Sequence, residues 1–334
     1  MQVALLQIVN KIVVLGTGGT IAGLATNSSD NVGYTAAQVS VSDLLDLIPG
    51  LKMRMAGCEL VTEQVAQIDS KDMSFGVWQQ LARRVNFYLE QADVKGIIIT
   101  HGTDTLEETA YFLSAVLPTR QLALKPVVLT CAMRPASSVA PDGPQNLLDA
   151  FAVALTPSAA GVMVVCAGTL HGAVEVQKIH PYRLDAFSSG DAGPLGFIEE
   201  GVVRLVRNWP LPHVNRAQAA IDTVAKINFL PRVEIVMNYA GASGFMVDAL
   251  VRTNGVDPDV PPVRGLVIAA TGNGSLHHDL EAALLRAQSA GVTVVLATRC
   301  SEGQVLPKPG SPFPDSRGLS PVKARVALML ALLE

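Results

Sequence analysis

The stretch VVLGTGGTIAG, residues 13–23, decides the fold of this 334-residue chain. An uninterrupted apolar run ends there in a glycine-rich turn that carries threonines on both sides of a glycine pair. Continuous apolar runs are typical of strands whose two faces are both covered, as in parallel sheets flanked by helices. A glycine-rich turn after such a strand either cradles a phosphate group or presents residues that react themselves.

Similar apolar runs recur along the chain and alternate with helical patterns. With the first run at 11–16, the expected strands are residues 96–100, 126–130, 161–165, 233–237, 265–270 and 292–297. Apolar residues at helical spacing predict helices over residues 72–92, 106–117 and 146–155. This β-then-α order predicts an α/β protein with mostly parallel sheets and helices on both faces.

The order breaks between residues 204 and 231, where RNWPLPHVNRAQ carries two prolines and many polar residues. We interpret 204–231 as a linker between a larger N-terminal α/β domain, 1–203, and a smaller C-terminal one, 232–334. Near the end of the chain, Ser320 and Pro321 predict the N-cap and first residue of a final helix.

Composition excludes several classes of partner. The formal net charge of −4, without clustered lysine or arginine, leaves no electrostatic footprint for nucleic acid. No apolar run approaches the roughly 18 residues that a membrane-spanning helix needs. The four cysteines are widely spaced and form no CxxC pair, and the N-terminus does not resemble a signal peptide. We therefore expect a cytoplasmic protein, or a periplasmic one if an export signal is missing from this sequence.

The glycine turn matches the phosphate-binding patterns poorly. Gly16 and Gly18 fit the start of the dinucleotide fingerprint, but position 21, where the third glycine belongs, is Ile21. A polar stretch rather than an amphipathic helix follows, and no GK[ST] sequence is present. A nucleotide-binding oxidoreductase remains an alternative that depends on Gly16 and Gly18 alone.

A second stretch, GIIITHGTDTLEETA at residues 96–110, repeats the arrangement of strand, polar turn and helix. Because ligands of open α/β sheets bind at the carboxyl ends of the strands, Thr20 of the first turn and Thr103 and Asp104 of the second could converge there. A role as a plain helix cap is the alternative for Thr103 or Asp104.

Together, TGGTIAG and THGTDTLEETA resemble the two signature stretches of the bacterial-type L-asparaginases and glutaminase-asparaginases. The resemblance continues in order through AMRP, DGPQNL, GPLGFI, TGNG and the final PVKARVALMLALL. It implies hydrolysis of the side-chain amide of L-asparagine to L-aspartate and ammonia, often with activity on glutamine, and no cofactor. It also implies a homotetramer of intimate dimers with sites shared between subunits, which the low content of charged residues, 16%, would suit.

The resemblance also implies site residues. The catalytic set is Thr20, Tyr34, Thr103, Asp104 and Lys178. Thr20 matches the nucleophile of an acyl-enzyme mechanism, direct attack by water being the alternative, and Tyr34 lies on a mobile loop, residues 24–38, that would close as a lid. Lys178 beside Thr103 could accept a proton, since desolvation disfavours a charged amine, and Asp104 would orient the lysine or hold the substrate ammonium.

The substrate-binding set implied by the resemblance is Gly19, Ser70, Lys71, Gly102, Thr103 and Asp104. Ser70 matches a residue that binds the substrate α-carboxylate, and glycine-rich turns expose N–H groups for a developing oxyanion. Lys71 departs from the family, since several members carry Gln or Glu there and contact the substrate ammonium. A lysine there would place like charges together, so we expect Lys71 to change substrate range or affinity. The alternatives are that Lys71 turns toward the α-carboxylate or simply faces solvent.

Two further departures concern the part of the pocket that the neighbouring subunit supplies. Gly241 stands where those members have an asparagine, and the subunit-crossing glutamate has no assignable equivalent, Glu302 lying too early. They favour asparagine over glutamine, and keep open a non-catalytic amino-acid-binding or sensor protein on the same scaffold. A related amidase acting on amidated transfer RNA is another alternative.

The remaining polar and aromatic residues give no separate function. His277 and His278 are adjacent, would point in different directions on a helix, and belong to no HExxH sequence, so we expect no metal site. His101 is interpreted as structural support for the second turn, and Trp78 as a packing residue.

Overall fold

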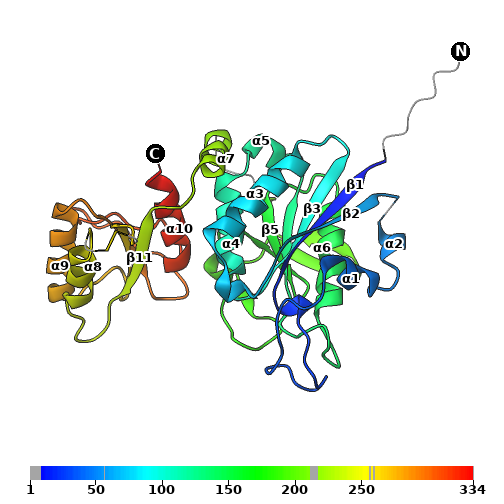
Figure 1. Ribbon diagram of the computed structural model, residues 1–334, viewed down its shortest axis with the longest axis horizontal. Helices are drawn as coiled ribbons and strands as arrows, with labels where there is room; N and C mark the ends of the chain where they lie inside the picture. The colour runs from blue at the N-terminus through cyan, green and yellow to red at the C-terminus, as the bar shows by residue number, and fades with distance from the viewer. Residues whose placement is uncertain (1–8, 56, 211–216, 256, 259, 334) are drawn as a thin grey trace, which may run out of the picture. The chain divides into compact units, whose positions relative to one another are not determined.

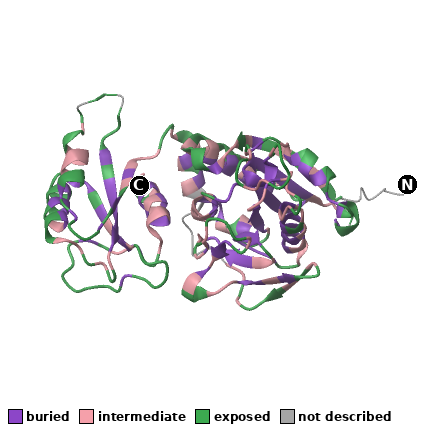
Figure 2. Cartoon of the chain, turned by 90° about the horizontal axis from the view of Figure 1, so that it is seen from below, coloured by how far each residue is buried: buried purple, intermediate pink, exposed green. Residues whose placement is uncertain are grey.

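The computed structural model describes residues 9–55, 57–210, 217–255, 257–258 and 260–333. The chain divides into two compact units, Met1–Lys226 and Ile227–Glu334. Each unit has a β-sheet whose central strands are buried almost throughout, as Figure 2 shows in purple. No helix in the described ranges is both long and apolar enough to cross a membrane.

The first unit is built on an eight-stranded sheet of order β10-β9-β6-β5-β4-β3-β1-β2. In chain order its strands are β1 Lys11–Gly18, β2 Glu59–Ile68, β3 Val94–Thr100, β4 Val127–Thr130, β5 Val162–Cys166, β6 Thr169–Gly172, β9 Gly196–Glu199 and β10 Val202–Leu205. Strands β2, β1, β3, β4 and β5 are parallel, whereas β6, β9 and β10 pair antiparallel. The sheet is therefore mixed, and the parallel strands β1, β3, β4 and β5 are made by the apolar runs.

Helices cover both faces of this sheet (Figure 1). One face packs on α1 Val41–Asp46, α2 Leu51–Arg54 and α6 Gly143–Leu155, the other on α3 Phe75–Leu89 and α4 Leu106–Val116. Ile12 and Val14 of β1 belong to the core beneath α1 and α6, while Val13 and Leu15 alternate to the opposite face and are equally buried. This two-sided burial explains why β1 is apolar without interruption. Short helices α5 Thr119–Leu122 and α7 Ala217–Lys226 complete the unit.

The second unit has a parallel sheet of order β11-β12-β13. Its elements are β11 Arg232–Met237, α8 Phe245–Arg252, β12 Val263–Ala270, α9 His278–Ser289, β13 Thr293–Thr298 and α10 Pro321–Ala331. Helices α8 and α9 pack on one face and α10 on the other. Ser320 is the N-cap of α10 and Pro321 its first residue, as the sequence predicts.

All seven predicted strands are present, and the α/β class with a larger and a smaller unit is confirmed. The strands not foreseen lie outside the parallel centre of the sheet. They are β2, β6, β9, β10 and the hairpin of β7 Gln177–Lys178 and β8 Phe187–Ser188. Strand β2 is at the sheet edge and buries only Val65 fully, so its sequence ELVTEQVAQI alternates with polar residues and lacks a continuous apolar run.

The segment interpreted as a linker, 204–231, differs from that interpretation. It includes the end of β10 and the helix α7, which packs against α3 and α4 in the first unit. The Gln79 side chain donates to the Val224 carbonyl in the same contact, at 2.7 Å. The two prolines and the polar residues before α7 favoured a linker in the sequence pattern, so the helix was not predicted. The division between the two units falls after Lys226.

The turn after β1 is shaped by a contact between two backbones. Gly19 has φ 84° and ψ −171°, a region that is essentially restricted to glycine, and it precedes η1, Thr20–Ala22, a single turn of 3-10 helix. A Cβ atom on Gly19 would lie 2.3 Å from the Cα and 2.4 Å from the N of Gly102. The glycine is therefore required both by its own conformation and by the neighbouring turn.

We predict that Gly19→Ala destabilises the protein more than Gly193→Ala does. Gly193 has nearly the same backbone conformation, φ 69° and ψ 169°, but a Cβ there would meet nothing within 4 Å. Overpacking against Gly102 should therefore add about 1–3 kcal/mol to the loss of unfolding free energy. Urea unfolding of both variants measures this difference, and equal losses would mean that backbone conformation alone, and not the contact, carries the cost.

Candidate active site

Three turns meet at the carboxyl ends of the neighbouring strands β2, β1 and β3. Gly19, in the turn after β1, abuts Gly102, in the turn after β3, and a Cβ on Gly102 would lie 2.5 Å from the Oγ of Ser70, which follows β2. Because Gly19 precedes Thr20 and Gly102 precedes Thr103, this interlock brings both threonines and Ser70 to one place. The convergence expected at the strand ends is thus a consequence of glycine–glycine packing.

The first polar group of the candidate site is a hydroxyl pair. The Oγ1 of Thr20 lies 2.7 Å from the Oη of Tyr34, and Thr20 is only 7% exposed. Tyr34 is held there because Leu24 and Thr35 exchange two backbone hydrogen bonds of 2.9 Å, closing the intervening loop at its base. Gly23 leaves room for the tyrosine ring, since a Cβ there would lie 2.8 Å from a ring carbon.

The second polar group is centred on Lys178, in the hairpin strand β7. Its Nζ donates to Thr103 Oγ1 at 2.8 Å and to Asp104 Oδ1 at 2.6 Å. The Lys178 side chain is 16% exposed, whereas that of Asp104 is 55% exposed and faces solvent on its other side. The lysine thus links a buried hydroxyl to a carboxylate at the mouth of the site, 74 residues away in sequence.

Ser70 and Lys71 are neighbours in η2, Ser70–Asp72, but their environments differ. Ser70 is buried, its Oγ accepts the backbone N–H of Asp104 at 3.2 Å, and its carbonyl accepts the hydroxyl of Thr105 at 2.8 Å. The side chain of Lys71 is 66% exposed and forms an ion pair with Asp69 at 3.2 Å. The hydrogen bond and charge of Asp69 raise the pKa of Lys71, which is therefore a cation at neutral pH.

The backbone donors of the two turns are used differently. The N–H of Gly19 donates to the Ile68 carbonyl at 2.9 Å, and its carbonyl accepts from Ala37 at 3.1 Å. Within the described ranges, the N–H groups of Thr20 and Thr103 donate to no protein acceptor. The N–H groups of Thr20 and Thr103 are therefore available to a ligand, whereas the N–H of Gly19 is not.

Behind the second turn, sequence reasoning named His101 as structural support and Trp78 as a packing residue, but it missed Thr109, which joins them. His101 Nδ1 lies 2.7 Å from the Gly102 carbonyl, and its Nε2 lies 2.9 Å from the Oγ1 of Thr109. Thr109 in turn accepts the indole N–H of Trp78 at 2.8 Å. Burial lowers the pKa of His101 to about 4, against a smaller raising effect of the Gly102 carbonyl, so the imidazole is neutral. Thr109 lies in the first turn of α4, eight residues after His101, and no local sequence pattern signalled this contact.

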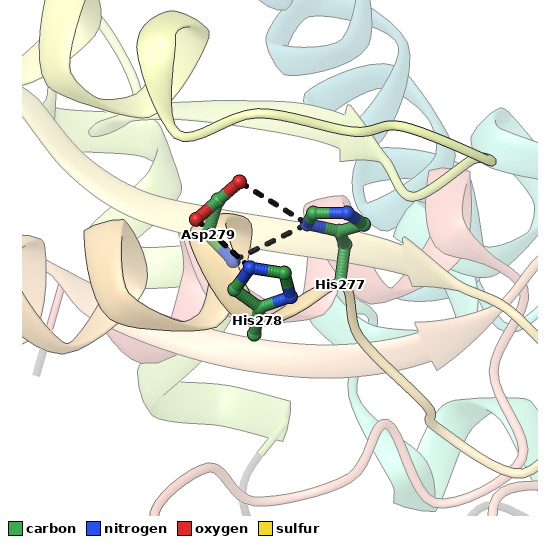
Figure 3. A group of neighbouring side chains, drawn as sticks. All are labelled: His277, His278 and Asp279. Carbon is green, nitrogen blue, oxygen red and sulfur yellow. Dashed lines mark hydrogen bonds and ion pairs between the residues drawn. The ribbon is translucent and has the colours of Figure 1, made fainter.

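The expectation that His277 and His278 point apart is wrong. His277 is the N-cap of α9 rather than a helical residue, and the two rings stack with centroids 4.4 Å apart (Figure 3). Asp279 lies 3.7 Å from His277 Nδ1 and 3.2 Å from His278 Nε2. His277 Nδ1 already accepts the N–H of Asp279 as the helix cap, and His278 is mostly exposed. We therefore assign no ion to this cluster.

Comparison with known proteins identifies the family of this chain. The family model described as "Asparaginase, N-terminal" matches residues 11–211, and the "Glutaminase/Asparaginase C-terminal domain" matches residues 232–334. L-asparaginase 2 of Escherichia coli (strain K12) is 38% identical in an alignment of 332 positions that covers 97% of this chain and 89% of that protein. Glutaminase-asparaginase of Pseudomonas fluorescens biotype A is 34% identical over 96% of this chain and 86% of its own length.

A solved structure, that of a probable cytoplasmic L-asparaginase from Campylobacter jejuni, has the same fold. It matches with a TM-score of 0.87 at 34% identity, over 97% of this chain and 95% of that one. This match argues against the alternative that the glycine turn is the dinucleotide site of an oxidoreductase. With both family models matched in order and relatives above 30% identity over nearly its full length, the chain belongs to the L-asparaginase and glutaminase-asparaginase family of amidohydrolases.

Proposed function

We propose that this protein hydrolyses the side-chain amide of L-asparagine to L-aspartate and ammonia, with Thr20 as the nucleophile. The observation that carries the proposal is the division of the site into two hydroxyl groups with separate partners. Thr20 is paired with Tyr34 at 2.7 Å, and Thr103 with Lys178 at 2.8 Å. Two activated hydroxyls on adjoining turns suit a reaction in two steps, formation and hydrolysis of an ester.

In the first step, the Thr20 oxygen attacks the amide carbon and the carbon–nitrogen bond breaks. The Thr20 proton passes to the oxygen of Tyr34 while the proton of the phenol goes to the leaving nitrogen, so ammonia departs neutral. In the second step, water attacks the ester, the bond to Thr20 breaks, and a proton returns to the Thr20 oxygen. Thr103, fixed by Lys178, is placed to orient that water.

The negative charge that develops on the carbonyl oxygen needs donors that are already in place. The backbone N–H groups of Thr20, at the start of η1, and of Thr103 fit this role because no protein acceptor in the described ranges uses them. The N–H of Gly19 is committed to Ile68, so a contact of Gly19 with substrate would come through its Cα. Ser70 and Asp104 remain the proposed contacts for the substrate α-carboxylate and α-ammonium.

Residues 24–38 are proposed to act as a lid. Two contacts support this: the bridge between Leu24 and Thr35 closes the base of the loop, and Tyr34 on the loop is hydrogen-bonded to Thr20. A movement of the loop would therefore also change the contact of Tyr34 with the proposed nucleophile. The cytoplasmic location expected from the sequence also stays a proposal, and the similar Campylobacter jejuni protein bears the description probable cytoplasmic.

Assembly into a homotetramer is proposed as well. The second unit exposes several large apolar side chains around β11 and α8, a density that commonly marks a protein interface. They are Ile235, Met237, Tyr239, Phe245 and Met246.

For substrate preference, we propose asparagine over glutamine. Lys71 places a fixed cation next to Ser70, and Gly241 has a φ of 75° with nothing within 4 Å of a Cβ position, so it supplies no side chain to recognise a longer substrate. No observation favours the sensor alternative or an amidated transfer RNA as substrate, and the net charge of −4 opposes the latter.

We predict that Thr20→Ala lowers ammonia release from L-asparagine by at least about 1,000-fold, because no other hydroxyl replaces the lost nucleophile. Thr20→Ser, which keeps a hydroxyl, should retain measurable activity, and both variants should unfold at the wild-type temperature within a few degrees. Ammonia assays with L-asparagine and L-glutamine measure the effect and the preference. Wild-type activity in Thr20→Ala would refute the role of Thr20 as nucleophile. If the wild-type protein binds L-aspartate but releases no ammonia from either amide, the protein is a sensor.

We predict that Lys71→Gln lowers the KM for L-asparagine by about 3- to 10-fold with little change in kcat, since the repulsion of the substrate ammonium by a solvent-exposed charge is worth about 1 kcal/mol. Lys52→Gln, which removes a surface lysine from α2, is the matched control and should leave KM unchanged. Steady-state kinetics in low salt are the measurement. If Lys71→Gln behaves like the control, Lys71 has no part in substrate recognition.

A further inference from the structure

A chain of buried polar groups lies directly behind the turn that carries Thr103. It runs from the indole N–H of Trp78 on α3, through the hydroxyl of Thr109 on α4, to the imidazole of His101 and the carbonyl of Gly102. His101 and Thr109 have no exposed surface, and Trp78 is buried with its ring stacked on Phe112 at 4.9 Å. The proposed reaction uses none of these side chains. Their series of hydrogen bonds nevertheless ends at Gly102, in the turn that carries Thr103.

The partners fix every proton in this chain. The Gly102 carbonyl can only accept, so His101 Nδ1 carries the hydrogen and donates it over 2.7 Å. His101 Nε2 is then an acceptor and takes the hydroxyl hydrogen of Thr109, whose oxygen accepts from Trp78. Since burial lowers the pKa of His101 to about 4, this single arrangement persists throughout the neutral range.

The last acceptor matters because of the peptide group to which it belongs. The Gly102 carbonyl and the Thr103 N–H are opposite ends of one planar peptide, so the direction of one fixes the direction of the other. Gly102 also packs against Gly19 and Ser70 with no room for a Cβ. A rotation of this peptide would therefore turn the Thr103 N–H and shift the contact with the turn of Thr20.

We propose that His101 is a positioning residue for the amidohydrolase reaction, with Thr109 and Trp78 holding it in place. By donating to the Gly102 carbonyl, it sets the orientation of the peptide between Gly102 and Thr103, and hence of the N–H and hydroxyl that Thr103 presents. The imidazole touches neither substrate nor reacting atoms and transfers no proton. This inference rests on the proposed function, because it takes Thr103 as part of the reacting group.

The test compares variants that remove a link with variants that keep it. Thr109→Val deletes the hydroxyl but keeps the shape, and Thr109→Ser restores the hydroxyl. His101→Leu deletes the donor to Gly102, whereas the side-chain amide of His101→Asn can place an N–H near the position of Nδ1. Trp78→Phe preserves the ring stack on Phe112 and removes the indole N–H.

The expected result is a loss in kcat rather than in binding. Thr109→Val and His101→Leu should lower kcat for L-asparagine about 10- to 100-fold with KM changed less than about 3-fold, the pattern of an interaction that acts in the transition state. The kcat of Thr109→Ser should stay within about 2-fold of the wild-type value, and that of His101→Asn should be higher than that of His101→Leu. The kcat of Trp78→Phe should lie between those of the wild type and Thr109→Val.

A structural role alone would give a different pattern. If kcat stays at the wild-type value wherever the variant is folded, and only the unfolding temperature falls, the inference is overturned. Should His101→Leu fail to fold, the comparison of Thr109→Val with Thr109→Ser decides. The proposed function is judged separately by Thr20→Ala, so an inactive Thr20→Ala beside fully active Thr109→Val would remove the positioning role and leave the reaction intact.

The buried imidazole also predicts a pH dependence of stability. Its pKa is about 4 in the folded protein and 6.5 ordinarily, and burial is the main cause, with no charged side chain contributing. Between these values the unfolded chain binds more protons, so stability is lost as pH falls from 6.5 to about 4 and levels off below. The unfolding equilibrium constant should rise up to about 300-fold more in the wild type than in His101→Asn over that range. Denaturant unfolding at several pH values measures this, and parallel pH profiles of the two proteins would contradict it.

Discussion

The contact between Gly19 and Gly102 is the constraint on which the candidate site depends. Two backbones approach so closely that a methyl group on Gly19 would lie 2.3 Å from the other chain segment. No side-chain interaction in the site sets positions as firmly, because both partners are main chain and both belong to turns anchored on adjacent parallel strands. The threonine that follows each glycine inherits its place from this contact. Ser70 closes the arrangement from the third strand, where Gly102 leaves it just enough room.

Around this rigid centre, the polar groups are arranged by burial. The hydroxyls of Thr20 and Thr103 are nearly inaccessible, whereas Asp104 and Lys71 reach solvent. The charged groups of Asp104 and Lys71 thus lie at the rim, where water offsets their desolvation, and the hydroxyls lie inside, where each needs a partner. Lys178 is the mostly buried charged group among these, and Asp104 is its ion-pair partner. The neutral His101 follows the same division, since a cation at its position would have no compensating charge.

The sequence was most informative where burial is two-sided. All seven predicted runs are strands. In β1, β3, β4, β5 and β12 the reason is that a strand covered on both faces leaves little room for a polar residue, whereas β11 lies at a sheet edge and exposes Ile235 and Met237. The sequence was least informative at edges, where β2 alternates and β6, β9 and β10 are short and antiparallel. In the site, the motifs led to Thr20, Thr103 and Asp104 by position at strand ends, but Lys178 and Tyr34 came only from the family resemblance. The partnership of His101 with Thr109 and Trp78 depends on how α3 packs on α4, which no local pattern encodes.

The loop closed by Leu24 and Thr35 has a consequence for the traffic of small molecules. Because its two ends are bonded to each other, residues 24–35 form one closed loop. Few hydrogen bonds to the other described residues hold it: Ala25 donates to the Ser137 hydroxyl, Val139 donates to the Ser28 carbonyl, and the Tyr34 hydroxyl pairs with Thr20. With about 1 kcal/mol for each hydrogen bond, detaching the loop costs far less than unfolding the unit beneath it. In the proposed role of this loop as a lid, substrate and product would exchange with solvent through a small local opening while the sheet stays intact. The same opening would withdraw Tyr34 from Thr20 and so separate the hydroxyl pair.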